Sequence, residues 1–219
     1  MHFDFALPSR NAPRADAAGE CGVVSHIEVL ESELRSFQIE LTSEQKRVLA
    51  RYCDELVHWN KQINLTGLGG SDMVRRLVVG PLWVGCQLKP QGVLADIGSG
   101  NGSPAIPLHV LCKFSKAHLT ETRARRAAFL RHITTTLELT RVIVHRSRFE
   151  EIASELRPVD WITLQGVAFT EELLNSIRNI ATATTTIVWI SSPDARPPGH
   201  PFWTLQVPFT GNTVFLFRC

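Results

Sequence analysis

A glycine-rich segment is the part of the chain whose residue types and spacing point most directly to chemistry. The segment D-I-G-S-G-N-G occupies positions 96–102, and its first two residues end a short apolar run at 93–97. Glycine tolerates positive φ and lets a ligand approach the backbone, and a turn from strand to helix lies at the sheet edge where open α/β folds bind ligands. The segment is therefore a candidate binding loop, although a plain tight turn would use the same residues.

The spacing of the glycines selects among ligands. A dinucleotide-binding loop has the pattern G-x-G-x-x-G, whereas this chain has Gly98, Gly100 and Gly102, followed by Ser103. The pattern D-x-G-x-G-x-G suits S-adenosylmethionine (SAM), whose methionine moiety lies against the loop and which carries no pyrophosphate. We therefore predict that SAM is the cofactor and that Asp96 and the three glycines belong to its site.

Two later segments supply further candidate contacts. Glu121 stands 25 residues after Asp96, at the tip of the next expected strand, where a carboxylate accepts hydrogen bonds from both ribose hydroxyls. After the third strand, S-R-F-E-E at 147–151 offers backbone groups for an adenine edge, Phe149 as an apolar wall, and Glu150. The alternatives are a solvated glutamate at a strand end and a helix start with acidic residues in its first turn.

These residues require a sheet to position them. After position 90 short β-branched or apolar runs alternate with helical patterns, which predicts a doubly wound parallel sheet. Two final runs, 202–209 and 213–217, predict an antiparallel hairpin. Seven strands ending in such a hairpin form the α/β, Rossmann-like fold of class I SAM-dependent methyltransferases.

The N-terminal third has a helical period instead. Apolar residues recur at spacings of three and four from 25 to 88, and Thr42 with Gln45 fits a capping box at the start of one helix. A third helix over 72–86 should break or kink at Gly80–Pro81. We therefore expect three parts: a mobile arm at 1–25, a helical cap at 26–90 and a SAM-binding domain at 91–219.

Composition limits the classes of partner. The 219 residues contain 23 Lys plus Arg and 21 Asp plus Glu, a net charge of +2, which excludes a strongly basic coat. Seven arginines nevertheless lie between 123 and 148 against one acid, Glu138, which is typical of a phosphate-binding surface or of a solvated basic face. The candidate RNA contacts are Arg75, Arg76, Arg123, Arg125 and Arg126.

Other patterns point away from metals and membranes. The five cysteines are scattered without a C-x-x-C pair, and the histidines lack metal-ligand spacing, so we expect reduced thiols and no metal site. No run approaches a membrane span, and the first 25 residues do not resemble a secretory signal. We expect a cytoplasmic monomer without a membrane partner.

Several motifs together resemble the GidB/RsmG family, which methylates guanine N7 in small-subunit ribosomal RNA. They are the segment W-N-K-x-x-N-L-T at 59–66, the glycine loop, P-A-I-P-L at 104–108 and R-R-x-x-F-L-R at 125–131. The resemblance covers about 42–219 and implies ribosomal RNA or the small subunit as partner. It places the family's SAM contacts on Gly98, Ser103, Phe149 and Glu150, and its ribose-binding acid on Glu121.

The chain departs from this family on the substrate side. Leu77 and Gly80 stand where the family has His and Asp, Ala105 replaces a glycine, Q-G-V-A-F at 165–169 replaces a segment containing S-R-A-F, and I-S-S-P at 190–193 lacks a lysine. A methyltransferase with another substrate and a non-catalytic SAM- or RNA-binding relative therefore remain alternatives. Guanine N7 has a free lone pair, so we expect no catalytic general base.

Overall fold

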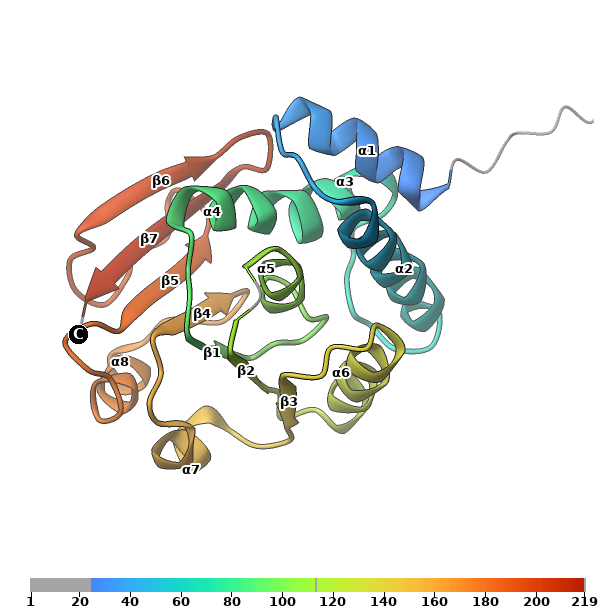
Figure 1. Cartoon of the computed structure of the whole chain (residues 1–219). Helices are drawn as coiled ribbons and strands as arrows, with labels where there is room; N and C mark the ends of the chain where they lie inside the picture. The colour runs from blue at the N-terminus through green and yellow to red at the C-terminus, as the bar shows by residue number, and fades with distance from the viewer. Residues whose placement is uncertain (1–24, 113, 219) are drawn as a thin grey trace, which may run out of the picture.

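The computed structural model describes residues 25–112 and 114–218, which form helices on both faces of a single sheet (Figure 1). The helices are α1 (His26–Ser36), α2 (Ser43–Asn60), α3 (Gly70–Val74), α4 (Gly80–Leu88), α5 (Ala105–Cys112), α6 (Ala124–Thr136), α7 (Phe149–Ile152) and α8 (Glu171–Arg178). The strands are β1 (Val93–Ile97), β2 (Lys116–Thr120), β3 (Val142–His145), β4 (Trp161–Gln165), β5 (Thr186–Ser191), β6 (Trp203–Val207) and β7 (Asn212–Arg218).

The seven strands lie in the order β3-β2-β1-β4-β5-β7-β6. The first five pair in parallel, whereas β7 is antiparallel to both β5 and β6. Chain order reverses between β1 and β4, so the carboxyl ends of these strands form the crevice in which open α/β sheets bind ligands. The predicted Rossmann-like fold with a C-terminal antiparallel hairpin is confirmed.

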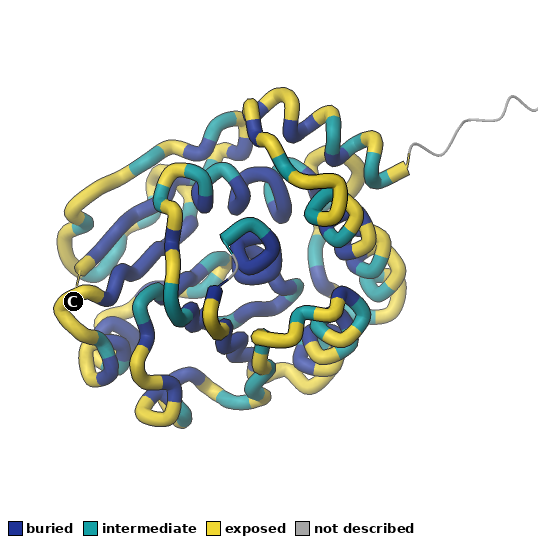
Figure 2. Tube along the Cα trace, viewed as in Figure 1, coloured by how far each residue is buried: buried dark blue, intermediate teal, exposed yellow. Residues whose placement is uncertain are grey.

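Two apolar cores lie on opposite faces of the sheet. One joins α1, α2, α4, α5 and α6 to the sheet, and the other packs α7 and α8 against β4 and β5. The helix α5 is buried from Ala105 to Val110, and Figure 2 shows it enclosed near the centre of the molecule. Because α5 follows the glycine loop directly, its burial fixes where that loop stands.

The helices before β1 share the first core with the sheet. The predicted capping box of α2 is confirmed: Gln45 N–H donates to Thr42 Oγ1 at 3.2 Å, and Thr42 N–H donates to Gln45 Oε1 at 3.0 Å. Leu30 and Leu56 are fully buried in the same core as Leu94 of β1. The expected cap therefore packs directly on the sheet, and all but the last residue of the expected arm at 1–25 lies outside the described residues.

Of the break or kink predicted at Gly80–Pro81, the break is wrong. Residues 70–88 stay helical through a π-helical turn at Arg75–Val79, and the N–H of Gly80 donates to the carbonyl of Arg75. Pro81 has no N–H to donate, and the wider turn before it accommodates the missing bond without a break. Within the described residues no helix is both long and apolar enough to cross a membrane.

Candidate cofactor site

A cavity of about 310 Å³ lies at the carboxyl ends of β1 to β4. Each strand end contributes to its wall, so residues far apart in the sequence meet there. Its lining comprises Ile97, Gly98, Thr120, Glu121, Thr122, Ser147, Arg148, Phe149, Glu150, Val167, Ala168, Thr170 and Leu173. The volume is at the lower end of the range for small-molecule sites.

Gly98 shapes the floor of this cavity. Its φ is +69°, a left-handed conformation that favours glycine, and a Cβ there would lie 2.5 Å from Cγ2 of Val167. Backbone without a side chain is therefore required at the point where β1 meets the end of β4. A ligand in the cavity can approach this backbone closely.

Glu121 lies directly after β2 and is 6% exposed. Its Oε2 accepts a hydrogen bond from the backbone N–H of Gly100 at 3.1 Å, and its Oε1 accepts one from the N–H of Arg123 at 2.7 Å. Oε1 also lies 3.5 Å from the hydroxyl of Thr122, whereas the bond from Gly100 is the one hydrogen bond to Oε2 among the described residues. These bonds fix the carboxylate and leave Oε2 the freer oxygen for a further donor.

The segment after β3 forms the opposite wall. Phe149 is buried, Glu150 is exposed, and both line the cavity. The buried hydroxyl Oγ of Ser147 has no hydrogen-bond partner among the described residues. A buried polar atom without a partner at a cavity wall fits a site that a polar ligand completes.

Asp96 is buried and is not among the residues that line the cavity. Its carboxylate is 1% exposed, and Oδ1 accepts a hydrogen bond from Oγ1 of Thr163 at 2.6 Å. Burial raises the pKa of Asp96 to about 7, although the bond from Thr163 opposes the rise. One carboxyl oxygen of Asp96 is thus bonded to β4, whereas Oδ2 is buried without a hydrogen-bond partner among the described residues.

The other predicted loop residues are not in the cavity lining either. A Cβ on Gly102 would meet Cδ1 of Ile106 at 2.4 Å, so this glycine permits close packing of the loop on α5. The Oγ of Ser103 donates to Oε1 of Gln165 at 3.2 Å and ties the loop to the end of β4. Of the eight predicted cofactor residues, Gly98, Glu121, Phe149 and Glu150 line the cavity, and Asp96, Gly100, Gly102 and Ser103 do not.

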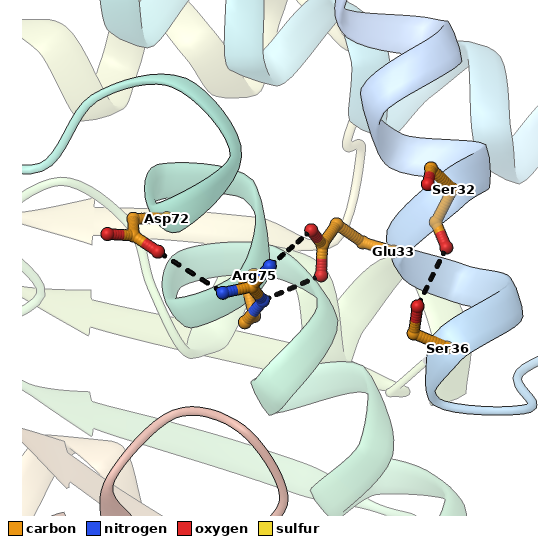
Figure 3. Close-up of polar contacts among 5 residues, drawn as sticks. All are labelled: Ser32, Glu33, Ser36, Asp72 and Arg75. Carbon is orange, nitrogen blue, oxygen red and sulfur yellow. Dashed lines mark hydrogen bonds and ion pairs between the residues drawn. The ribbon is translucent and has the colours of Figure 1, made fainter.

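The predicted RNA contacts divide into two groups. Arg75 is engaged in an ion pair: Nε and Nη2 each lie 2.8 Å from a carboxylate oxygen of the buried Glu33, and Nη1 lies 3.3 Å from Asp72 (Figure 3). Arg126 donates from Nη2 to the carbonyl of Asn64 at 2.8 Å. The remaining three candidates are Arg76, Arg123 and Arg125. Within the described residues their side chains form no ion pair.

Several lining residues were missed by the sequence analysis. Thr170 and Leu173 lie at the start of α8, and Val167 and Ala168 lie in the loop that follows β4. The signal that identifies them is positional, because β4 is the neighbour of β1 across the switch point. Among the described residues no group of three or more His, Cys, Asp or Glu side chains is placed to hold a metal ion.

The residues present fit SAM. A loop that excludes a Cβ at Gly98, a fixed carboxylate at Glu121 and an unpaired hydroxyl at Ser147 surround one cavity of nucleoside size. Glu121 would receive ribose hydroxyls, Phe149 would contact the adenine, and the backbone of the glycine loop would receive the methionine moiety. The dinucleotide pattern G-x-G-x-x-G would place its third glycine at position 103, where this chain has serine, so the loop does not match one that binds a pyrophosphate.

Comparison with known proteins gives a consistent result. The family model GidB, described as rRNA small subunit methyltransferase G, matches residues 45–194. A Wolinella succinogenes protein named ribosomal RNA small subunit methyltransferase G is 31% identical over 160 residues, covering 73% of this chain and 82% of the relative. A Chloroflexus aggregans protein of the same name is 38% identical over 121 residues, covering 54% of this chain and 50% of that relative.

Solved structures show the same fold at low sequence identity. The mitomycin 7-O-methyltransferase MmcR has a TM-score of 0.54 at 14% identity, covering 87% of this chain and 74% of its own. A putative methyltransferase from Escherichia coli has a TM-score of 0.51 at 16% identity, covering 71% and 90%. These similarities concern the fold alone.

Proposed function

The chain belongs to the GidB family of rRNA small subunit methyltransferases, and from this membership we propose that it transfers a methyl group from SAM to N7 of a guanine in 16S (small-subunit) ribosomal RNA. One structural observation carries the proposal. The carboxylate of Glu121 is held by the glycine loop at the wall of the cavity, through its bond from the N–H of Gly100. This is the arrangement that a ribose-bearing methyl donor needs.

Methyl transfer to guanine N7 requires no acid or base catalysis from the side chains. Bound SAM supplies a methyl group that is electrophilic because it is attached to a sulfonium. Guanine N7 presents a free lone pair, so no residue has to remove a proton before attack. The residues of the chain therefore contribute by holding both partners in line and by excluding water.

An RNA substrate needs positive charge near the cavity. Arg148 lines the cavity, and Arg123 and Arg125 are exposed at the start of α6, close to Glu121 in the chain. Phosphate contacts from such side chains make binding weaken as salt rises. The target base would be unpaired or flipped, since N7 of a paired A-form helix lies in a deep, narrow groove. We infer a monomer that acts in the cytoplasm on the RNA or on the assembled small subunit.

A methyltransferase with a different substrate is the second candidate. Val167 presents an apolar side chain at the cavity wall, in the segment where the family resemblance implies arginine. Incubation of fractionated cell extract with tritiated SAM separates the candidates. Label in small-subunit ribosomal RNA supports the first, and label confined to another fraction supports the second.

The proposal is tested in cells by deletion of the encoding sequence. Mass spectrometry of small-subunit ribosomal RNA should show loss of one 7-methylguanosine, and complementation should restore it. Complementation with Glu121→Ala should restore it poorly. An unchanged guanine-methylation profile in the deletion strain would contradict the RNA assignment.

A further inference from the structure

The segment 60–68, which runs from the last residue of α2 toward α3, is joined to the glycine loop. Asn101 is held from two directions: Tyr52 donates from its hydroxyl to the carbonyl of Asn101 at 2.8 Å, and Asn101 donates from Nδ2 to the carbonyl of Leu65 at 3.4 Å. Burial raises the pKa of Tyr52 well above its usual range, so the hydroxyl stays protonated and remains a donor. A movement of segment 60–68 would therefore act on the glycine loop.

One side chain determines the internal shape of this segment. Oδ1 of Asn60 accepts from the N–H groups of Leu65 at 2.8 Å and Thr66 at 3.0 Å, and its Nδ2 donates to the carbonyl of Thr66 at 2.9 Å. These three bonds close a compact turn. Within the turn Lys61, Gln62 and Asn64 are exposed.

Arg126 of α6 connects this turn to the other side of the loop. Its Nη2 donates to the carbonyl of Asn64 at 2.8 Å, and its Nη1 lies 3.7 Å from the position that a Cβ on Gly100 would occupy. The guanidinium thus lies beside Gly100, whose N–H binds Glu121, and reaches across to the turn. Arg125, its neighbour on α6, is exposed.

We propose that segment 60–68 is one wall of the site for the acceptor base and that Arg126 is a positioning residue, which holds this wall against the glycine loop. The glycine loop is the part of the site that would receive the methionine moiety, which carries the methyl group. No residue of segment 60–68 lines the cofactor cavity, so the turn lies beside the cofactor site rather than in it, and its exposed amides can pair with the edges of a base. This role rests on the function proposed above, and it differs from the phosphate contact expected for Arg126 from the sequence.

Arg125 and Arg126 form a matched pair for testing this role. Hydrogen exchange of the full chain without cofactor should show at least about tenfold faster exchange across 61–68 in Arg126→Ala, and wild-type exchange in Arg125→Ala. Binding to small-subunit ribosomal RNA should depend less on salt in Arg125→Ala. The slope of log K against log salt should become shallower by about one, the change expected when one phosphate contact is lost. The slope should remain at the wild-type value in Arg126→Ala.

Methyl transfer gives the third readout. Arg126→Ala should lower kcat at least tenfold, a larger factor than the one by which it raises the Kd for SAM. Wild-type exchange across 61–68 together with a reduced salt slope in Arg126→Ala would overturn the positioning role and assign Arg126 to phosphate. If the wild-type chain methylates no RNA, the proposed function fails, while the exchange comparison still decides whether Arg126 holds the turn.

A milder variant covers the case in which Arg126→Ala does not fold. Arg126→Met keeps an unbranched apolar stem but has no N–H to donate to the carbonyl of Asn64. Faster exchange across 61–68 in Arg126→Met supports the positioning role. Wild-type exchange in this variant contradicts it, because the turn would then keep its shape without the bond from Arg126.

Discussion

The backbone N–H of Gly100 donates a hydrogen bond to Oε2 of Glu121 at 3.1 Å, which joins the loop after β1 to the end of β2. The glycine loop and the acidic residue are therefore parts of one unit rather than two separate contacts to a ligand. Loss of the carboxylate would therefore remove the proposed ribose contact and also the bond that holds the loop.

Replacement of Glu121 by alanine should weaken SAM binding by roughly 1–3 kcal/mol, because charge-assisted hydrogen bonds to a buried carboxylate are lost. Isothermal titration calorimetry measures the change directly. Glu155→Ala, an exposed glutamate outside the cavity lining, is the control and should bind as the wild type does. Wild-type affinity in Glu121→Ala would show that the ribose is bound elsewhere.

Replacement of Gly98 by valine should abolish SAM binding. A side chain there meets Cγ2 of Val167 and must also adopt positive φ. Gly98→Ala combined with Val167→Ala removes the atom in contact but leaves the backbone strain. If the double variant binds better than Gly98→Ala alone, the clash is the larger effect, and normal binding by Gly98→Val would exclude this cavity as the site.

Asp96 should make stability depend on pH. Its pKa in the folded chain is about 7, above the unfolded value, so the folded state binds the extra proton and stability falls as pH rises from about 4 to 7. Asp96→Asn has no carboxyl group to ionise, so it lacks this loss of stability at higher pH. The free energy of unfolding of the variant, measured by urea denaturation relative to the wild type, should rise by up to about 3 kcal/mol between about pH 5 and pH 8. A difference that stays constant with pH would mean that Asp96 is ionised throughout.

Arg75 should matter for stability. Its partner Glu33 has a side chain only 8% exposed, so Arg75→Ala leaves a buried carboxylate without its cation and should cost about 3 kcal/mol of unfolding free energy. Denaturant unfolding measures the loss. The variant Glu33→Gln/Arg75→Met should recover part of it, and Arg76→Ala should change stability by less than about 1 kcal/mol. Equal effects of Arg75→Ala and Arg76→Ala would contradict a structural role for the pair.

Local patterns were sufficient to predict most helices and strands and their order along the chain. The period of the apolar residues indicated the helices, the capping box at Thr42 identified the start of α2, and the final hairpin distinguished this sheet from other doubly wound folds. These features depend on neighbours in sequence. The continuous helix through Pro81 was not predicted, because a π-helical turn depends on how the helix packs.

Residues of the candidate site could be predicted where only one role commonly explains that residue type at the end of a strand. Gly98 and Glu121 are such residues, and both line the cavity. Asp96 and Ser103 belong to the same motif, but their side chains form bonds within the protein, to Thr163 and Gln165. The direction of a polar side chain depends on partners distant in sequence, so spacing alone could not separate the residues that line the cavity from those bonded within the protein.

The most direct test of the central claim uses purified full-length protein, SAM and small ribosomal subunits from a strain that lacks the modification. Nuclease digestion followed by mass spectrometry counts the 7-methylguanosine formed. The account predicts one 7-methylguanosine per small subunit with the wild-type chain and a large reduction with Gly98→Val. Absence of 7-methylguanosine from both free RNA and assembled subunits, by a chain that binds SAM, would contradict it.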